Sequence, residues 1–184
     1  EMLNTAIENG DITLERIDDA VRRILRVKFM MGLFERPYSD PALIETVGSE
    51  AHRAVARQAV SESLVLLRNE NQALPLDQDA GVIFVAGQGG ADIGLQSGGW
   101  TIEWAGGMGD ITPGTTILDG IEAAVSADTE VYYNALGRFN RVTDADDNTI
   151  VADIGIVVVG EFPYSEWEGD NAFLSIDPAD VAMI

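Results

Sequence analysis

Three continuous apolar runs constrain the fold of this chain more than any other feature. They are VIFVAG at 82–87, EVYYNA at 130–135 and DIGIVVVG at 153–160, and a helical pattern, TTILDGIEAAV at 115–125, separates the first two. Strands that are apolar along their whole length are typical of parallel sheets buried between helices. The sequence therefore predicts an α/β fold with a mostly parallel sheet and helices on both faces.

Helical patterns also fill much of the segment that precedes the sheet. A short helix is expected to close at Gly10, and Thr13 is expected to cap a longer helix that stops at Gly32. Residues 33–50 carry two prolines and a glycine, which indicates a linker with one short helix started by Asp40. Ser49 then caps a helix to about residue 62, and LVLLR at 64–68 is expected to be a strand.

Composition and charge exclude several classes of protein. The 31 acidic and 11 basic residues give a net charge of -20, which repels nucleic acids and anionic membrane surfaces. The chain has no cysteine, so it forms no disulfide, zinc ribbon, thiol nucleophile or iron–sulfur cluster. His52 is the single histidine and lies in a helical pattern far in sequence from any nucleophile-elbow motif, which excludes a Ser-His-Asp triad.

The ends of the sequence suggest a piece of a longer protein. The first residue is glutamate, and DPADVAMI at 177–184 stops where a helix has just begun. We therefore expect the chain to be cut at both ends. No run reaches the ~20 apolar residues that a membrane-spanning helix needs, and no signal peptide is recognisable.

Two motifs resemble ligand-binding loops without matching them fully. GQGGADIG at 87–94 follows a strand as a dinucleotide-binding turn does, but Asp92 stands where a glycine is required and its charge repels phosphate. DADDN at 144–148 has calcium-loop spacing, but Thr149 replaces the turn glycine. The first motif is interpreted as a tight turn leading to another kind of loop, with a nucleotide-binding turn as the alternative. The second is interpreted as a solvated acidic turn, with a calcium loop as the alternative.

A glycine-flanked loop with two tryptophans, SGGWTIEWAGG, occupies residues 97–107 and is called here the tryptophan loop. It follows a strand, and ligands of parallel α/β sheets bind outside the carboxyl ends of the strands. Trp100 and Trp104 offer flat apolar faces that suit stacking on a sugar ring. The alternative is that both rings pack inward as anchors of the loop.

An acidic loop at residues 161–171 leaves the last predicted strand. It combines four carboxylates with three aromatic rings: Glu161, Glu166, Glu168, Asp170, Phe162, Tyr164 and Trp167. Apolar surroundings raise the pKa of a carboxyl group by desolvation, and neighbouring carboxylates raise it by repulsion. A general acid needs such a group. Glu166, between Ser165 and Trp167, is the most ring-flanked candidate; a solvated turn or a metal loop is the alternative.

These segments together resemble glycoside hydrolase family 3. GEFPYSEWEGD resembles the acid/base loop of that family, and GGWTIEW resembles its tryptophan loop. AVRRILRVKFMMGLFERPYSDP and HRAVARQAVSESLVLLRNENQALPL resemble the passage between its two domains. The matches run in the right order from about residue 9 to about residue 171.

The resemblance implies a domain organisation. Residues 1–33 are then the terminal helices of a (β/α)8-type barrel, 34–50 the interdomain linker and 51–184 an α/β sandwich truncated at its C-terminus. The missing barrel domain of the same chain is thus an expected partner of this part. The resemblance also implies a periplasmic or extracellular location.

The resemblance also implies an activity for the intact protein. It is a retaining β-glucosidase or exo-β-glucanase that releases terminal non-reducing glucosyl residues from β-glucosides or β-glucans, with no cofactor and no metal. Glu166 matches the catalytic acid/base, Trp104 a tryptophan that clamps the sugar beyond the cleaved bond, and Trp100 its neighbour. No residue here matches the nucleophile, so this part alone is expected to be inactive. A non-catalytic carbohydrate-binding module is the alternative.

Overall fold

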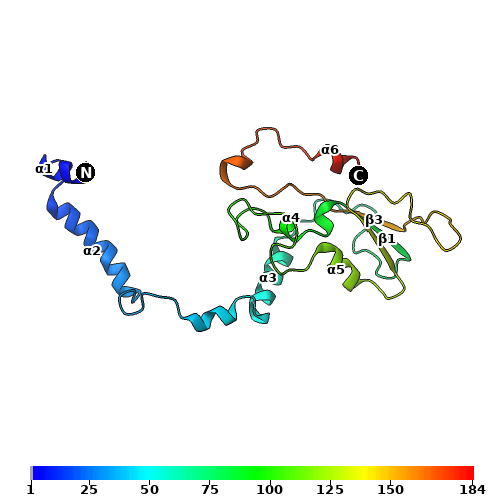
Figure 1. Ribbon diagram of the computed structural model, residues 1–184, viewed down its shortest axis with the longest axis horizontal. Coiled ribbons are helices and arrows are strands. Elements are labelled where there is room, and N and C mark those ends of the chain that lie inside the picture. Colours follow the sequence, from blue (N-terminus) through cyan, green and yellow to red (C-terminus); the bar gives the residue numbers. More distant parts are fainter. Residues whose placement is uncertain (1) are drawn as a thin grey trace. The chain divides into compact units, whose positions relative to one another are not determined.

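The structure is a computed structural model that describes residues 2–184 and divides into two compact units, Glu1–Arg68 and Asn69–Ile184. Figure 1 shows helices in the first unit and a small sheet with its helices in the second.

The first unit is helical, and the sequence predicted its helix starts correctly. Its elements are α1 (Met2–Glu8), α2 (Leu14–Met30), the 3-10 helix η1 (Pro41–Thr46) and α3 (Glu50–Ser63). Thr13 Oγ1 accepts a hydrogen bond from the Arg16 amide at 3.2 Å, and Asp40 and Ser49 cap the next two helices in the same way. Side-chain oxygens at these positions satisfy amides that have no partner within the helix.

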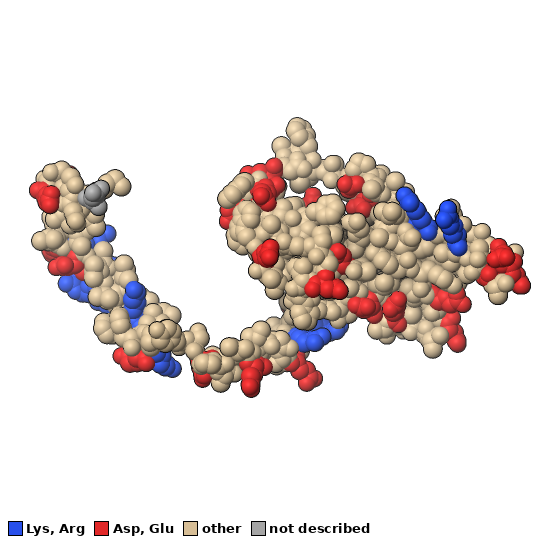
Figure 2. All heavy atoms as spheres, viewed as in Figure 1, with Lys and Arg blue, Asp and Glu red and all other residues tan. Residues whose placement is uncertain are grey.

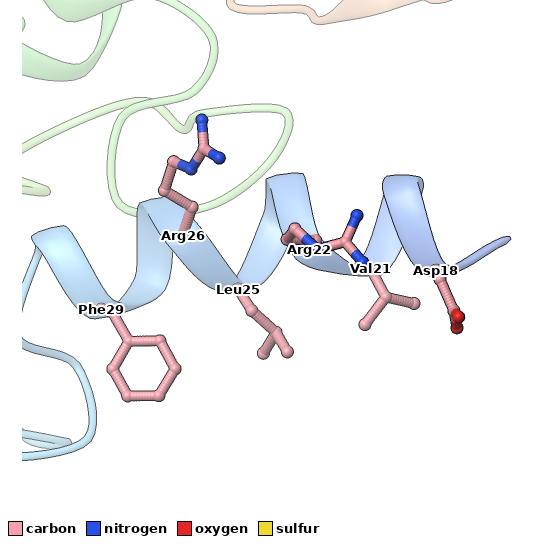
Figure 3. A pocket seen from close by; sticks show the side chains of 6 residues that line it. All are labelled: Asp18, Val21, Arg22, Leu25, Arg26 and Phe29. Atoms are coloured by element: carbon pink, nitrogen blue, oxygen red, sulfur yellow. The ribbon is translucent and has the colours of Figure 1, made fainter. Parts of the chain in front are cut away.

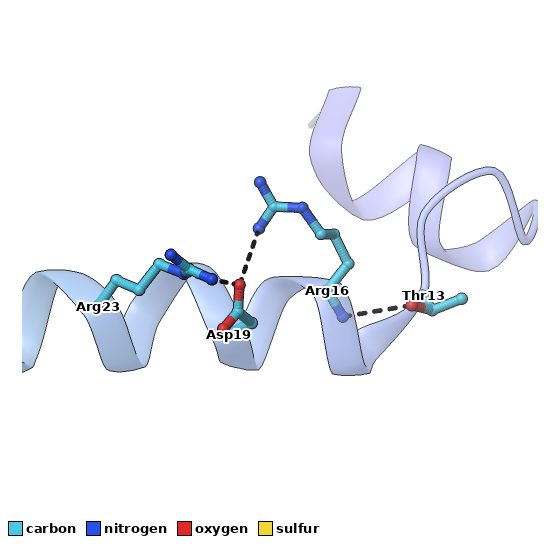
Figure 4. A network of polar contacts seen from close by, with 4 residues as sticks. All are labelled: Thr13, Arg16, Asp19 and Arg23. Carbon is cyan, nitrogen blue, oxygen red and sulfur yellow. Dashed lines mark hydrogen bonds and ion pairs between the residues drawn. The ribbon is translucent and has the colours of Figure 1, made fainter.

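Helix α2 has one polar and one apolar side. Asp19 accepts a 2.9 Å hydrogen bond from Arg23 Nε and lies 3.9 Å from Arg16 Nη1 (Figure 4). Val21, Leu25 and Phe29 recur every four residues, point to one side of the helix (Figure 3) and are exposed. An apolar stripe at this spacing is the kind of face that a helix buries against another element.

The strand expected at residues 64–68 is absent, so that prediction is wrong. LVLLR forms no regular element and its side chains are exposed. A strand requires a neighbouring strand for its backbone hydrogen bonds. The segment falls in the first unit, whose described elements are all helices.

The second unit contains a parallel sheet of three strands in the order β2-β1-β3. Strand β1 is Val82–Ala86, β2 is Glu130–Asn134 and β3 is Ile154–Val157. Val85 of the central strand pairs with Tyr133 on one side and Ile156 on the other. The sequence predicted all three strands, and the predicted α/β class is confirmed.

A small apolar core fixes the sheet to helix α5 (Ile117–Ala124). Ile83 and Val85 are fully buried, and Leu118 and Ile121 of the helix pack against them. On the opposite face the Phe84 ring stacks on Phe139 from the loop after β2, with centroids 4.2 Å apart. The sequence predicted helices on both faces; in Asn69–Ile184 a helix covers one face and a loop ring meets the other.

The remaining elements of this unit are short. They are η2 (Gln88–Gly90), α4 (Ile93–Ser97), η3 (Glu166–Gly169) and α6 (Pro178–Val181). Figure 2 shows Asp and Glu side chains scattered over the visible face of the unit. Arg138 and Arg141 are its basic residues. Among residues 2–184, no helix has the length and hydrophobicity that crossing a bilayer requires.

Candidate functional site

The strand order brings the two informative loops to one edge of the sheet. The chain leaves β1, crosses through α5 to β2 on one side, and returns as β3 on the other side of β1. Such a reversal of strand order is a topological switch point, where ligands of open α/β sheets bind. The tryptophan loop follows β1 and the acidic loop follows β3. Because the two strands are parallel neighbours, the segments that lead to the two loops leave from adjacent strand ends, with η2 and α4 between β1 and the tryptophan loop.

The glycines after β1 are used for packing. A Cβ at Gly87 would overlap the carbonyl oxygen of Val158, and one at Gly89 would lie 3.0 Å from the Val158 side chain. Asp92 caps α4 through the Leu95 amide at 2.8 Å and also accepts from the Gly109 amide at 2.9 Å. The carboxylate thus occupies the amides that a phosphate would need. The interpretation of GQGGADIG as a turn that leads to another kind of loop fits this geometry.

Backbone contacts join the tryptophan loop to the acidic loop. The Ser165 hydroxyl is 2% exposed and donates to the carbonyl oxygen of Trp104. That oxygen also accepts from the Trp100 amide at 3.1 Å, which closes the turn between the two tryptophans. A Cβ at Gly99 would overlap the carbonyl of Tyr164, so only glycine allows this approach. The two loops therefore form one structural piece.

Three indole rings lie along this junction. Ring centroids are 6.0 Å apart between Trp100 and Trp104 and 5.4 Å apart between Trp104 and Trp167. The exposed fractions of the three residues are 63%, 39% and 68% in chain order. The alternative that Trp100 and Trp104 pack inward as loop anchors is therefore wrong in this structure, because neither residue is buried.

Glu166 is the first residue of η3 and its side chain is exposed. Its φ of 49° lies in the left-handed region, as do those of Trp100 and Ile102, both at 64°. Non-glycine residues adopt this conformation at a cost of order 1–3 kcal/mol, and such residues cluster at functional sites. Half of the six non-glycine residues with positive φ in the described chain thus fall in these two loops.

The four carboxylates of the acidic loop have different surroundings. Glu161 accepts a 2.7 Å hydrogen bond from the Tyr164 hydroxyl, and this bond raises the pKa of Tyr164. The Tyr164 ring also lies against Gly169, where it leaves no room for a side chain. Glu161 therefore supports the loop, whereas the carboxylate of Glu166 has no hydrogen bond or ion pair within residues 2–184.

The expectation that aromatic rings enclose Glu166 is wrong for this chain. Trp167 turns toward Trp104, and Tyr164 turns toward Glu161 and Gly169. Phe162 is exposed. The rings that flank Glu166 in sequence therefore pack elsewhere, and the carboxyl group remains open to water and to an incoming ligand.

The acidic turn at 144–148 is held together by its own hydrogen bonds. Asp144 Oδ1 accepts from the amides of Asp146 and Asn148 at 2.9 Å, and Asp144 Oδ2 accepts from the Asn148 side chain at 3.1 Å. The bonds from Asn148 lower the pKa of Asp144. Within the described residues, no three His, Cys, Asp or Glu side chains gather as a metal site.

Sequence reasoning missed two residues that the structure brings into the site. Ser165 forms its bond 61 positions away from itself, and nothing in its local sequence indicates a distant partner. Trp167 was treated only as a ring beside Glu166, although its ring pairs with Trp104. A tryptophan directly after a candidate acid/base residue is the signal that the sequence offers.

Comparisons with known proteins identify relatives of this chain. The model of the glycosyl hydrolase family 3 C-terminal domain matches residues 64–184. The lysosomal beta glucosidase of Dictyostelium discoideum is 33% identical over 196 residues, covering 100% of this chain and 24% of that protein. The periplasmic beta-glucosidase of Salmonella typhimurium is 36% identical over 133 residues, covering 69% of this chain and 17% of that protein.

A solved structure extends the comparison to the fold. The exo-1,3/1,4-beta-glucanase from a Pseudoalteromonas species superposes with a TM-score of 0.74 at 36% identity, covering 91% of this chain and 21% of that one. The chain thus spans less than a quarter of the length of each of these three relatives.

Proposed function

Because the chain belongs to glycoside hydrolase family 3, we propose that the intact protein hydrolyses terminal β-D-glucosyl residues of β-glucosides or β-glucans with retention. The relatives named beta-glucosidase or beta-glucanase support this substrate class. Glu166 supplies the general acid/base, and Trp104 and Trp100 contact the sugar beyond the cleaved bond. No cofactor takes part.

One observation carries the proposal. The Ser165 hydrogen bond to Trp104 holds an exposed carboxylate and a group of exposed indoles on one rigid piece at the switch point of the sheet. A glycosidase needs a carboxyl group that reaches the glycosidic oxygen and a surface that holds the leaving sugar. Both are present here on adjacent loops.

The reaction takes two steps. In the first, a nucleophilic carboxylate attacks the anomeric carbon while protonated Glu166 gives its proton to the departing oxygen. In the second, Glu166 takes a proton from water, which attacks the same carbon and frees the nucleophile. Retaining enzymes place the two carboxyl groups about 5 to 5.5 Å apart. We assign the nucleophile to the barrel domain that the family resemblance implies.

The domain organisation and location are parts of the same proposal. Residues 1–33 end the barrel, 34–50 link the domains and 51–184 form the truncated α/β sandwich. The exposed apolar side of α2 with Val21, Leu25 and Phe29 supports this, because a barrel would cover it (Figure 3). A periplasmic or extracellular location is proposed because the Salmonella typhimurium relative is named periplasmic.

The decisive experiment replaces Glu166 by alanine in the full-length enzyme. Turnover of β-glucosides with poor leaving groups is expected to fall by on the order of 10² to 10⁴. Substrates with activated leaving groups need less protonation, so their first step is less affected. Azide should restore turnover by replacing water in the second step, with β-glucosyl azide as the product.

Glu168→Ala is the matched control, because Glu168 lies in the same 3-10 turn and carries the same charge. It is expected to keep near-wild-type turnover. Undiminished hydrolysis of poor-leaving-group substrates by Glu166→Ala would refute the assignment. If the wild-type enzyme bound β-glucan oligosaccharides without hydrolysing any β-glucoside, the three exposed indoles would instead define a carbohydrate-binding module.

A further inference from the structure

Of the three neighbouring indoles, Trp167 is the one to which the proposed function gives no role. It directly follows Glu166, is 68% exposed, and its ring centroid lies 5.4 Å from that of Trp104. An indole this exposed contributes little to the core of the unit, whose buried side chains lie around Ile83 and Val85. Exposed apolar groups that adjoin a candidate site are typical of ligand-binding surfaces.

The three indoles form a continuous aromatic surface with Trp104 in the middle. The planes of Trp104 and Trp167 are inclined by 45°, and those of Trp100 and Trp104 by 78°. One flat sugar ring stacks on one indole face at a time. The separation of the Trp104 and Trp167 ring centres is comparable with the width of one pyranose ring. Two linked sugars with a bend between them therefore fit this pair of rings.

We propose that Trp167 contacts the second sugar unit on the leaving-group side, so that the enzyme prefers substrates with at least two sugars beyond the cleaved bond. This inference rests on the proposed function, in which Trp104 holds the first of those sugars. Trp167 is then a substrate-binding residue that sets chain-length preference, and Glu166 remains the catalytic residue.

The backbone holds Trp167 firmly enough for this role. Ser165, two residues before Trp167, is buried and hydrogen-bonded to the Trp104 carbonyl. The Glu168 amide, directly after Trp167, donates to the Ser165 carbonyl at 3.3 Å. Trp167 and Trp104 are therefore presented by one locked junction. An aromatic pair fixed in advance loses little freedom on binding, which favours affinity.

The charge of the surroundings selects a neutral ligand. Glu161, Glu166, Glu168 and Asp170 lie in the same loop, and Arg138 and Arg141 are the basic residues of the whole unit. An anionic sugar or a phosphate would meet repulsion at this surface. Uncharged gluco-oligosaccharides can stack on the indole rings and are not repelled by the negative potential of the four carboxylates.

The test compares three variants of the full-length enzyme, Trp167→Ala, Trp167→Phe and Phe173→Ala. Phe173 is an exposed aromatic residue of the following segment (86% exposed) with no ring partner in the described chain, so it is the control. The measurement is kcat/KM for 4-nitrophenyl β-glucoside, laminaribiose and laminaritriose, because only the trisaccharide has a second leaving-side sugar.

Trp167→Ala is expected to lower the trisaccharide-to-disaccharide ratio of kcat/KM by about 2- to 10-fold, the range for loss of one aromatic contact. Trp167→Phe should lower this kcat/KM ratio only slightly, and Phe173→Ala should leave it unchanged. The value for the nitrophenyl substrate should stay within about 2-fold of wild type for Phe173→Ala, and for the Trp167 variants it serves as the reference against which the change in the ratio is read. An unchanged ratio in Trp167→Ala, or an equal fall in Phe173→Ala, would overturn the inference.

A binding measurement covers the case in which Trp167→Ala does not fold. Laminaritriose is titrated into Glu166→Gln and into Glu166→Gln/Trp167→Phe while indole fluorescence is followed. The fluorescence change should be present in the first and smaller in the second, because Trp100 and Trp104 still contribute there; equal changes would overturn the role of Trp167. Failure of the wild-type enzyme to hydrolyse any of the three substrates would instead count against the proposed function, which keeps the two failures distinguishable.

Discussion

Removal of the Ser165 hydroxyl tests the junction between the two loops directly. Ser165→Ala keeps nearly the same side-chain volume in a site that is 2% exposed, so it deletes one hydrogen bond without opening a cavity. The Trp104 carbonyl loses Ser165 as a donor but keeps the Trp100 amide at 3.1 Å. The carbonyl is therefore not left without a partner, and the full penalty for an unsatisfied buried group does not apply.

Because the Trp104 carbonyl keeps one donor, the free-energy cost of Ser165→Ala is that of a single lost hydrogen bond. A hydrogen bond of this kind contributes about 0.5–1.5 kcal/mol net, which corresponds to a factor of about 2 to 10 in the ratio of docked to undocked loop. Because kcat/KM follows the docked fraction of the loop, we expect the kcat/KM of the full-length enzyme on laminaribiose to fall by at most this factor. Ser165→Cys, which keeps a weak donor, should fall between wild type and Ser165→Ala.

The assay needs a control that removes a serine hydroxyl elsewhere in the two joined loops. Ser97 begins the tryptophan loop, is exposed, and its hydroxyl has no hydrogen-bond partner in the described residues. Ser97→Ala should leave kcat/KM unchanged. Wild-type kcat/KM and wild-type thermal unfolding in Ser165→Ala would refute the argument that this bond locks the acidic loop to the tryptophan loop.

Further predictions concern two glycines and a half-buried phenol, Tyr133, of the same unit. Gly99→Ala should lower kcat/KM because its methyl group would overlap the Tyr164 carbonyl, whereas Gly120→Ala, in α5 with open space around it, should stabilise the domain by about 0.5–1 kcal/mol in thermal unfolding. Unchanged kcat/KM in Gly99→Ala, or destabilisation by Gly120→Ala, would contradict the packing described for these two glycines. Burial and the charge of Asp92 raise the pKa of Tyr133, so its stabilising effect is complete below the unfolded pKa of about 10 and is lost as pH rises through the folded value. Between pH 8 and pH 11, the free energy of urea unfolding of the full-length enzyme should therefore fall more for wild type than for Tyr133→Phe. Equal falls would contradict a raised pKa of Tyr133 in the folded state.

Local patterns were sufficient to predict most elements of the fold. The caps at Thr13, Asp40 and Ser49 and the three strands follow from short-range chemistry, and the structure has each of them. The strand expected at 64–68 failed because an apolar run does not specify whether a neighbouring strand is available to pair with it. Short helices such as α4, five residues long, leave too little periodicity to be recognised.

The candidate site was predictable only in part, for a related reason. The sequence identifies Glu166, Trp104 and Trp100 by type and through the family resemblance, but not the contact that joins their loops, because Ser165 and Trp104 are 61 residues apart. It also assigned the rings beside Glu166 to that carboxylate, whereas they contact Trp104, Glu161 and Gly169. Neighbours in sequence share a loop, but the direction of each side chain depends on tertiary packing.

The exposure of Glu166 is consistent with a proton donor that works on a substrate held between two domains. A carboxyl group already enclosed by its own loop would have no open side from which to reach the glycosidic oxygen. In the proposed mechanism, an exposed carboxylate on this turn reaches the glycosidic oxygen when the substrate and the barrel domain cover it, and they also remove water from the carboxyl group. The order β2-β1-β3 is therefore essential to the proposal. It places the strand ends that lead to the two loops side by side, so that the proposed proton donor and the rings proposed to hold the leaving sugar share one support.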